Sequence, residues 1–271
     1  MSLEDQMVDR ILYSGFSLIE KRKCLSIPGK TGWSPLPVGF KAFRAKFNDE
    51  DVLATDCSAF DWTFPEWVVD LLLVLYEDML VNPSDTFSKM FRARWYQVLH
   101  RAILRLPDGT RYEQCDAGLM KSGWFRTISV NSAAQVLIHD LAALRSGIRR
   151  PIQLWTMGDD VLMSWPKDEP EAAFLAALAT TGILVKQAER SPDFAGFRIT
   201  ANAVLPLYPR KHLFLLGHVA PDMAEMVANA FVMMYCLSEG SLAVQIRSAV
   251  AKYATLTTRR ASHWAHGVVR V

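Results

Sequence analysis

Two adjacent carboxylates near the middle of the chain constrain its fold most strongly. Asp159 and Asp160 follow Gly158, and an apolar run lies on each side, at residues 152–155 and 161–165. Two short apolar runs that are separated by a glycine-containing turn are typical of a β-hairpin. We therefore predict a hairpin with both acids at its tip, where their charges repel each other and a divalent cation would relieve that repulsion.

A second acidic segment lies well upstream of this hairpin. Residues 51–55 form a short, mostly apolar run, which predicts a buried strand that ends at Asp56. Asp61 follows in the stretch DCSAFDW at residues 56–62, so the two acids have the spacing Asp-x4-Asp. The chain thus offers carboxylates from two segments that are far apart in sequence.

A segment of small polar residues lies between the two acidic segments. Gly123 loosens a loop there, and a helix is predicted to follow it. Ser122, Thr127 and Asn131 carry small hydrogen-bonding groups. Because Thr127 and Asn131 are four residues apart, they are expected on the same face of that helix.

The order Asp-x4-Asp, Ser-Gly-x3-Thr-x3-Asn and Gly-Asp-Asp resembles motifs A, B and C of viral RNA-dependent RNA polymerases. The sobemovirus and polerovirus type is the most similar, because residues 56–62 look like its D-x-S-G-F-D-W and residues 27–32 look like its I-P-S-K-P-G. Residues 181–186 are similar to motif D, and residues 194–197 lie where motif E would fall. Ala59 replaces the usual glycine of motif A, a small change in size.

The resemblance implies an α+β fold of the right-hand polymerase type. Residues 51–204 would form the palm with motifs A to E, an antiparallel sheet backed by helices. Residues 205–271 would form a partial helical thumb with a basic tail. Residues 1–50 would be an N-terminal helix and loop at the end of a fingers region that is otherwise largely absent.

Hydrophobic periodicity and turn signals predict the individual elements. Helices are expected near residues 3–13, 65–80, 85–99, 169–181, 223–237 and 242–256, a hairpin at 101–113, and strands at 183–188 and 194–199. Gly147 is expected to end the helix of motif B. The helix near 65–80 is expected to open with a Thr63–Glu66 capping box and to bury a stripe of apolar side chains, namely Val68, Leu71, Leu72 and Leu75. The basic, aromatic tail from 259 is expected to fray, with RNA contact as the alternative.

The resemblance also implies a two-metal mechanism. Two magnesium or manganese ions about 3.5–4 Å apart activate a 3′-hydroxyl and neutralise the departing pyrophosphate. Asp56 and Asp159 are the predicted metal ligands, with Asp160 as a weaker or outer contributor. Lys186 is the predicted general acid that protonates the pyrophosphate.

Nucleotide recognition is assigned by the same resemblance. Asp61 would work with Asn131 to recognise the ribose 2′-hydroxyl, whereas reverse transcriptases carry a bulky aromatic residue at the Asp61 position. Ser122, Gly123 and Thr127 would position the nucleotide and the motif B loop. The predicted ligands are therefore ribonucleoside triphosphates, an RNA template and the product strand.

Three other functions were considered. A P-loop at residues 24–31 is rejected because Cys24 stands where the first glycine is needed. A reverse transcriptase-like polymerase shares the acids, but Asp61, Asn131 and Gly158 argue against it. A catalytically deficient palm that acts as a scaffold in a replication complex is disfavoured by the intact acids.

Composition sets the remaining expectations for this chain of 271 residues with a formal net charge of +2. RNA binding must then come from local basic patches rather than from a global field. Four cysteines without a zinc pattern indicate a reducing compartment such as the host cytoplasm. No transmembrane segment is predicted, so attachment to membrane-associated replication complexes would need partners. The basic fingers segment that grips the triphosphate is expected from the same polyprotein or from a second chain.

Overall fold

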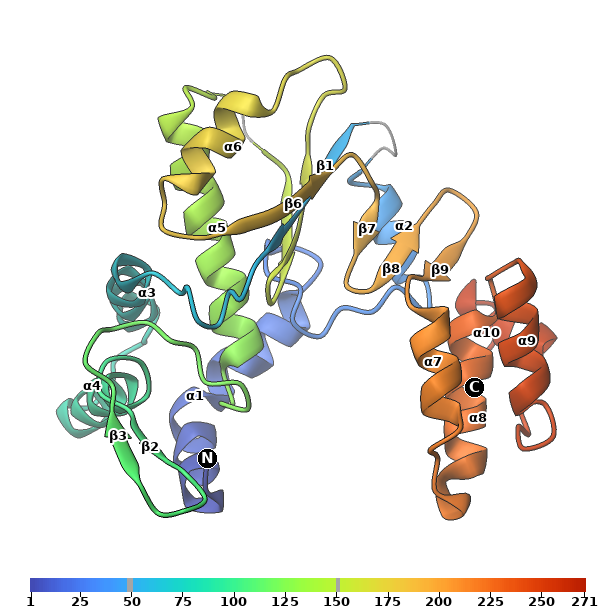
Figure 1. Cartoon of the computed structure of the whole chain (residues 1–271), viewed down its shortest axis with the longest axis horizontal. Helices are drawn as coiled ribbons and strands as arrows, with labels where there is room; N and C mark the ends of the chain where they lie inside the picture. Colours follow the sequence, from blue (N-terminus) through green and yellow to red (C-terminus); the bar gives the residue numbers. More distant parts are fainter. Residues whose placement is uncertain (48–50, 150–151) are drawn as a thin grey trace. The chain divides into compact units, whose positions relative to one another are not determined.

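The computed structural model describes residues 1–47, 51–149 and 152–271 (Figure 1). The chain forms two compact units. The first comprises Met1–Gly32 and Thr55–Glu189, and the second comprises Trp33–Ala54 and Arg190–Val271. Both units contain helices and strands, and the strand pairs with a described register are antiparallel. The predicted α+β class is therefore confirmed.

A four-stranded sheet carries the acidic segments. Its order is β4-β5-β1-β6, and its strands are β1 (Val52–Cys57), β4 (Leu154–Met157), β5 (Asp160–Ser164) and β6 (Val185–Glu189). β4 and β5 pair antiparallel with Met157 opposite Asp160, so the hairpin predicted from the two apolar runs is confirmed. Buried and exposed side chains do not alternate along these strands. Consecutive residues are buried, namely Trp155, Thr156, Val161 and Leu162, which indicates a sheet that is covered on both faces.

The first unit also contains helices. They are α1 (Leu3–Lys23), α3 (Glu66–Asp78), α4 (Asp85–Leu99), α5 (Thr127–Arg145) and α6 (Ala172–Ala179). Of these, α5 and α6 contact strands of this sheet. α5 packs against β4 and α6, and it is the long helix beside the sheet in Figure 1. A separate exposed hairpin is formed by β2 (Ile103–Arg105) and β3 (Arg111–Glu113), as predicted. No helix among the described residues has both the length and the apolarity needed to cross a bilayer.

Helix α1 is longer than the sequence pattern predicts. Ser2 and Asp5 form a reciprocal capping box at its start, and the helix continues to Lys23 rather than ending at Tyr13. The described contacts explain the extension, since tertiary packing stabilises helices that propensity alone leaves marginal. Phe16 packs against Tyr76 and Phe91, which holds the second half of the helix on the core.

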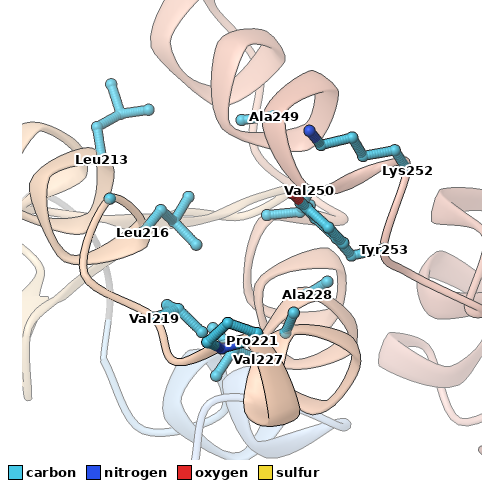
Figure 2. Close-up of a pocket in the computed structure, with 12 residues that line it drawn as sticks. Leu213, Leu216, Val219, Pro221, Val227, Ala228, Ala249, Val250, Lys252 and Tyr253 are labelled. Atoms are coloured by element: carbon cyan, nitrogen blue, oxygen red, sulfur yellow. The ribbon is translucent and has the colours of Figure 1, made fainter.

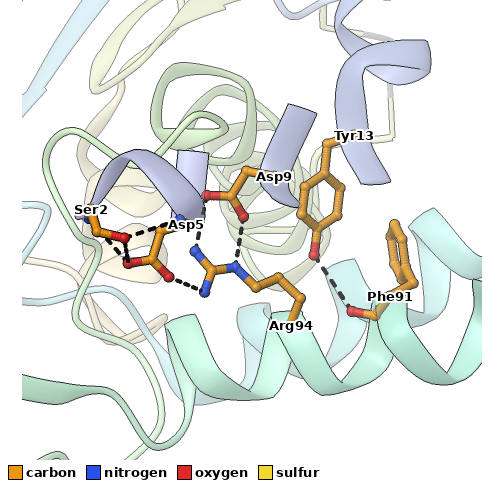
Figure 3. Close-up of polar contacts among 6 residues, drawn as sticks. All are labelled: Ser2, Asp5, Asp9, Tyr13, Phe91 and Arg94. Carbon is orange, nitrogen blue, oxygen red and sulfur yellow. Dashed lines mark hydrogen bonds and ion pairs between the residues drawn. The ribbon is translucent and has the colours of Figure 1, made fainter. Parts of the chain in front are cut away.

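Two buried arginines attach α1 to the rest of the first unit. Arg94 of α4 donates to both oxygens of Asp9, at 2.7 and 3.0 Å, and to Asp5 at 2.8 Å (Figure 3). Arg126, the N-cap of α5, donates to both oxygens of Glu20 at 2.7 and 3.0 Å. A bidentate arginine–carboxylate pair restrains the orientation of both side chains in addition to its charge attraction, so α1 is positioned at two points along its length.

Helix α3 departs from its predicted start and from its predicted face. The capping box is absent: Pro65 is the N-cap without a side-chain hydrogen bond, and the Thr63 hydroxyl donates instead to the Ala59 carbonyl. Val68 and Leu72 are buried as expected, but Leu71 and Leu75 are 44% and 41% exposed. The prediction was wrong for these two because α3 buries a narrower stripe on α4 and α5, completed by Val69 and Tyr76.

The second unit combines a small sheet with a group of helices. Its strands are β7 (Asp193–Phe194), β8 (Phe197–Ile199) and β9 (Val204–Pro206). Its helices are α2 (Gly39–Arg44), α7 (Pro209–Leu216), the 3-10 helix η1 (Pro221–Met223), α8 (Ala224–Tyr235), α9 (Ser241–Val250) and α10 (Thr258–Ala265). α8 lies within the predicted range 223–237, and α9 begins one residue before the predicted range 242–256 and ends at Val250, whereas α7 was not predicted.

The basic tail is ordered rather than frayed. It forms α10, where the Thr257 side chain accepts from the Arg260 amide, and Ala261 and Ala265 are fully buried. The Lys41 ammonium donates to the His266 carbonyl at 3.1 Å. The expectation of a frayed terminus was wrong because small residues four apart let this helix pack closely on its neighbours in the second unit.

Candidate functional site

The acidic turn projects from a buried hairpin. Gly158 has a φ of +67°, a left-handed conformation that a side chain would strain, and it permits the tight turn between β4 and β5. Asp159 and Asp160 are both exposed, while the strands on either side are buried. The rigid strands therefore fix the turn, and the turn presents the carboxylates to solvent.

Residues of the 27–32 stretch extend this support. The Lys30 amide donates to the Thr156 carbonyl at 2.7 Å, and the Thr156 amide donates to the Pro28 carbonyl at 3.1 Å. The Lys30 ammonium is buried, donates to the Cys24 carbonyl at 2.8 Å and lies 4.2 Å from the centre of the Trp155 ring. This segment is thus hydrogen-bonded to β4 at Thr156, close to the acidic turn.

Asp56 and Lys186 meet on neighbouring strands of the sheet. The Lys186 ammonium donates to Asp56 Oδ2 at 2.7 Å, although the two residues are 130 positions apart. Their side chains are 60% and 40% exposed, Lys186 being the more open. The structure thereby brings the predicted general acid next to a predicted metal ligand.

Asp160 has a perturbed acidity. The loss of hydration around its carboxyl group, followed by the negative charges of Asp159 and Asp56, raises its pKa to about 6. The residue is nevertheless accessible at the surface, so an ion can reach it from solvent. The direction of the pKa shift means that the three acids repel one another, which is the electrostatic condition that a divalent cation relieves.

The candidate donors for a metal ion are the three acids of the site. Within residues 1–47, 51–149 and 152–271, no three Asp, Glu, His or Cys side chains are drawn together into a ready-made metal cluster. The chemistry of the donors still fits, because Asp56, Asp159 and Asp160 offer only carboxylate oxygens, which magnesium and manganese prefer. The three acids therefore supply the type of donor that such an ion requires.

A polar triad lies beside the acidic turn. Asp61 accepts one hydrogen bond from the Ser122 hydroxyl and another, at 3.0 Å, from Asn131 Nδ2. Asn131 is 4% exposed, and its Oδ1 has no hydrogen-bond partner among the described residues. An unpaired buried acceptor is costly, so this atom is suited to a hydrogen bond from a ligand hydroxyl.

Thr127 and Gly123 shape the loop in front of α5. The Thr127 hydroxyl donates to the Lys121 and Trp124 carbonyls, at 2.8 and 3.0 Å. Gly123 has a φ of +94°, and a Cβ there would meet nothing within 4 Å. Thr127 therefore holds the loop through its hydroxyl, and Gly123 gives the backbone a conformation that other residues rarely adopt.

A cavity of about 410 Å³ is lined by residues of all three motifs and is called the nucleotide cavity below. Its lining comes from the segment after β1, from the start of α5 and from the acidic turn, namely Ala59, Phe60, Asp61, Trp62, Thr127, Ile128, Asn131, Gly158 and Asp159. The three motifs that are separated in sequence thus share one cavity, and its size is in the range of small-molecule sites.

A second cavity lies entirely within the C-terminal unit. It measures about 500 Å³ and has a largely apolar lining from α7, η1, α8 and α9 (Figure 2). Lys252 and Tyr253 supply the only titratable side chains among its lining residues. None of the predicted site residues lines this cavity, so the candidate chemistry belongs to the first unit.

Sequence reasoning missed two buried residues of the site. Gln135 contacts the acidic turn, and its spacing continues the four-residue series of Thr127 and Asn131, a signal that was present in the sequence. Ser132 also contacts the turn, but no spacing or composition signal distinguishes it from other serines of the chain. Only the packing of α5 against β4 identifies it.

Comparison with known families agrees with this arrangement of motifs. The profile described as "Viral RNA-directed RNA-polymerase" matches residues 41–228, more than half of the chain. The chain therefore belongs to this family. Its members generally use divalent metal ions.

The similar curated proteins come from plant and fungal viruses. Protein P1-P2 of Turnip yellows virus is 31% identical over 252 residues, which are 84% of this chain and 22% of that protein. Protein P1-P2 of Potato leafroll virus is 30% identical over 244 residues, 80% of this chain and 21% of that protein. The chain thus spans about a fifth of these relatives. The RNA-directed RNA polymerase of Mushroom bacilliform virus is 26% identical over 93% of this chain and 63% of its own length.

A solved structure has a similar fold. The RNA-dependent RNA polymerase of a human picobirnavirus, in an insertion-loop deletion mutant, superposes with a TM-score of 0.66 over 95% of this chain and 53% of that chain. The sequence identity is 15%, so this likeness concerns the fold alone.

Proposed function

We propose that this chain catalyses RNA-directed RNA synthesis in the replication of a positive-strand RNA virus. The observation that carries the proposal is the cavity in which residues of all three motifs meet, with Asp61 bonded to Ser122 and Asn131 and with Asp159 on the same wall. Membership of the viral polymerase family supports the same conclusion. The reaction is nucleotidyl transfer from ribonucleoside triphosphates to the 3′ end of a product strand.

We also propose the finer architecture that this function needs. Residues 51–204 act as the palm, and residues 205–271 act as a partial thumb with its tail packed as α10. Residues 1–50 precede the palm as the end of a fingers region. The likeness in fold to the picobirnavirus polymerase supports this assignment.

In this mechanism Asp56, Asp159 and Asp160 hold two magnesium or manganese ions. When bound, such ions activate the attacking hydroxyl and stabilise the charge that develops on the phosphates. The raised pKa of Asp160 supports the assignment, because its causes are burial and then the negative charges of Asp159 and Asp56, and a bound cation would offset both. Asp56 and Asp159 are the main ligands, and Asp160 contributes at longer range.

The neighbouring residues bind and orient the nucleotide. Asn131 Oδ1 accepts a hydrogen bond from the ribose 2′-hydroxyl, while Asp61 keeps the amide of Asn131 in place and is itself held by Ser122. Thr127 and Gly123 set the shape of the loop beneath the nucleotide. A pocket built to receive this hydroxyl discriminates against deoxyribonucleotides, since they would leave the buried acceptor unpaired.

Lys186 supplies the proton for the leaving group. Its ammonium is held beside Asp56, one of the proposed metal ligands, and it is open to solvent for reprotonation. Proton donation by a positioned side chain contributes about 10²–10⁴-fold to a rate. We assign Lys186 to protonate pyrophosphate as it leaves.

RNA and further polypeptide segments complete the proposed complex. A cavity of about 820 Å³ shares Asp61 and Trp62 with the site and includes Arg101, Arg105 and Lys121, a combination of cations and an exposed aromatic ring that suits single-stranded RNA. A fingers segment from the same polyprotein, or from a second chain, grips the triphosphate. The complex acts in the host cytoplasm and meets membranes through its partners.

Template-directed incorporation of labelled nucleotides tests the proposed function. With an RNA template, a primer and Mn²⁺, we expect ribonucleotide incorporation by the protein combined with its fingers segment. Asp159→Asn should lower the rate by about 10³-fold, because several kcal/mol of charge stabilisation are lost. Asp168→Asn, which changes an exposed acid outside the site, is the matched control and should retain activity.

Sugar discrimination separates this function from a reverse transcriptase. Asn131→Ala should reduce the preference for ribonucleotides by about tenfold, the value of one hydrogen bond to the 2′-hydroxyl. Preferential use of deoxyribonucleotides by the unmodified protein, or full incorporation by Asp159→Asn, would refute the proposal.

A further inference from the structure

Two buried side chains of α5 connect the acidic turn to the rest of the sheet. Ser132 is 1% exposed and Gln135 is fully buried, and neither lines the nucleotide cavity. Both follow Asn131 on the same helix. Their contacts suggest a role that is distinct from nucleotide binding.

Ser132 holds both the turn and the strand that precedes it. Its hydroxyl donates to the Ile128 carbonyl at 2.7 Å and accepts from the Gly158 amide at 2.9 Å. A hydroxyl has one proton, so donation within the helix leaves a lone pair directed at Gly158. The Ser132 carbonyl accepts from the Thr156 hydroxyl at 2.9 Å. One residue of α5 therefore fixes the backbone on the strand side of Asp159.

Gln135 joins the turn to the end of β1. Its Nε2 lies 3.4 Å from the Asp159 carbonyl oxygen and 3.4 Å from Cys57 Sγ, next to Asp56. An amide nitrogen carries two protons, so it can donate one to each acceptor. Both contacts are long and individually weak, but they connect the two acid-bearing segments through a single side chain.

A second link ties the same turn of α5 to β1. His139 Nδ1 lies 2.8 Å from the Gln135 carbonyl oxygen, and His139 Nε2 lies 3.0 Å from the Thr55 hydroxyl. These groups are buried, so water cannot easily take the place of a lost partner, and breaking one of these hydrogen bonds costs free energy. Helix α5 thus contacts β1 on one side and the acidic turn on the other.

We infer that Ser132 and Gln135 are positioning residues that set the separation of Asp56 and Asp159. This inference rests on the proposed function, because it concerns the same carboxylates. Asp56 and Asp159 carry like charges, so their mutual repulsion favours a larger separation unless a rigid element that contacts both segments restrains the turn. A packed helix is such an element, and sites need their groups held to within about 0.5 Å. Ser132 and Gln135 act through the acids and do not touch the substrate.

The test compares Ser132→Ala and Gln135→Met with Ser129→Ala in the full chain. Ser129 is a buried serine of the same helix, and no hydrogen bond from its hydroxyl to the hairpin occurs among the described contacts. Binding of Mn²⁺ alone is measured by the decrease of the free-ion paramagnetic resonance signal. We expect Ser132→Ala and Gln135→Met to weaken Mn²⁺ binding by about tenfold, the lower limit for residues that orient metal ligands. Ser129→Ala should bind Mn²⁺ as the unmodified protein does.

Two further readouts separate positioning from loss of structure. At a fixed Mn²⁺ concentration, Ser132→Ala should lower kcat by about tenfold while the nucleotide KM changes by less than about twofold, and added Mn²⁺ should recover part of the rate. Ser132→Thr keeps the hydroxyl and should restore Mn²⁺ affinity. Thermal unfolding of each variant is recorded, and binding is compared well below the transition.

Equal Mn²⁺ affinities for Ser132→Ala, Gln135→Met and Ser129→Ala would overturn the inference. If Ser132→Ala fails to fold, Ser132→Thr and Gln135→Met decide the question. Failure of the proposed function gives a different result: Mn²⁺ binding would still depend on Ser132, but the unmodified protein combined with its fingers segment would incorporate no nucleotide. Loss of nucleotide affinity alone, with unchanged Mn²⁺ binding, would place both residues in substrate binding and also contradict the inference.

Discussion

Two ion pairs of the first unit have the same length and opposite surroundings. The Arg94–Asp9 pair beneath α1 and the Lys186–Asp56 pair at the candidate site both have a nitrogen–oxygen distance of 2.7 Å. The side chains of Arg94 and Asp9 are 10% and 0% exposed, whereas those of Lys186 and Asp56 are 60% and 40% exposed. The comparison shows that the role of an ion pair depends on its exposure to solvent and not on its length alone.

The energetic reason lies in solvation. Breaking a buried pair leaves a charge without either water or a partner, which costs about 3–5 kcal/mol. Breaking an exposed pair costs about 0–1 kcal/mol, because water and salt replace the lost partner. Hydrogen bonds from Arg94 to Asp9 also raise the pKa of Arg94, so the guanidinium stays charged. The buried pair is therefore a fixed attachment, and the open pair can exchange its partners during a reaction.

Arg94→Met gives the largest expected effect and tests the buried member. It leaves the fully buried Asp9 carboxylate unpaired, so the free energy of unfolding should fall by about 3–5 kcal/mol. Urea unfolding followed by circular dichroism measures the change. The double variant Asp9→Asn with Arg94→Met removes the stranded charge and should recover part of the loss. A fall of less than about 1 kcal/mol for Arg94→Met would contradict the assigned role.

Lys186→Arg tests the open member. Arginine keeps the charge and the pairing with Asp56, but it does not release a proton at neutral pH. We expect incorporation to slow by about 10²-fold, while the free energy of unfolding changes by less than about 1 kcal/mol. The measurements are single-nucleotide incorporation rates and urea unfolding.

Arg198→Lys is the matched control for this substitution. Arg198 pairs with Asp193 at 2.7 Å on the surface of the second unit, with side chains 48% and 20% exposed. Replacing its guanidinium by an ammonium should change neither the incorporation rate nor the free energy of unfolding appreciably. An unchanged rate for Lys186→Arg would remove Lys186 from the proposed proton transfer while leaving its ion pair intact.

His139 extends the comparison to a buried group whose described hydrogen-bond partners, the Thr55 hydroxyl and the Gln135 carbonyl, are uncharged, and its expected effect is the smallest. Burial lowers its pKa to about 4 from an ordinary value of 6.5. The unfolded chain therefore binds more protons than the folded one between these values, and stability is lost as the pH falls through this window. From about pH 6 to about pH 5 the loss attributable to His139 should be about 1 kcal/mol.

Urea unfolding at several pH values checks the His139 prediction. His139→Asn cannot titrate and should flatten the dependence of stability on pH in this window. His218→Asn is the control, because the His218 ring is exposed and its described side-chain hydrogen bond joins it to the Phe214 carbonyl of α7, an uncharged partner. Identical pH profiles for the unmodified protein and His139→Asn would show that His139 is not the group responsible.

Local patterns predicted those elements whose causes are local. The β4–β5 hairpin followed from two apolar runs around a glycine, and α4 has the predicted bounds Asp85–Leu99. Helix α1 continued beyond its predicted end because Phe16 packs on residues of α3 and α4, a contact that no local pattern contains. The exposed side chains of Leu71 and Leu75 have the same explanation, since only the neighbours of α3 determine which stripe is buried.

The sequence by itself determined the chemistry that this chain can offer. The order of Asp56, Asp61, Asn131 and Asp159, with their spacings, pointed to the polymerase family before any fold was known. Spacing and periodicity are encoded along the chain, so residue types and element types can be derived from them.

The tertiary structure alone decided which of these groups meet. The strand order β4-β5-β1-β6 places Lys186 on Asp56, and the packing of α5 places Ser132 and Gln135 against the acidic turn. Such contacts join residues far apart in sequence, and they depend on strand order and on helix rotation, for which periodicity carries no information. For this protein, the sequence specified the acids, and the fold specified the geometry in which they are held.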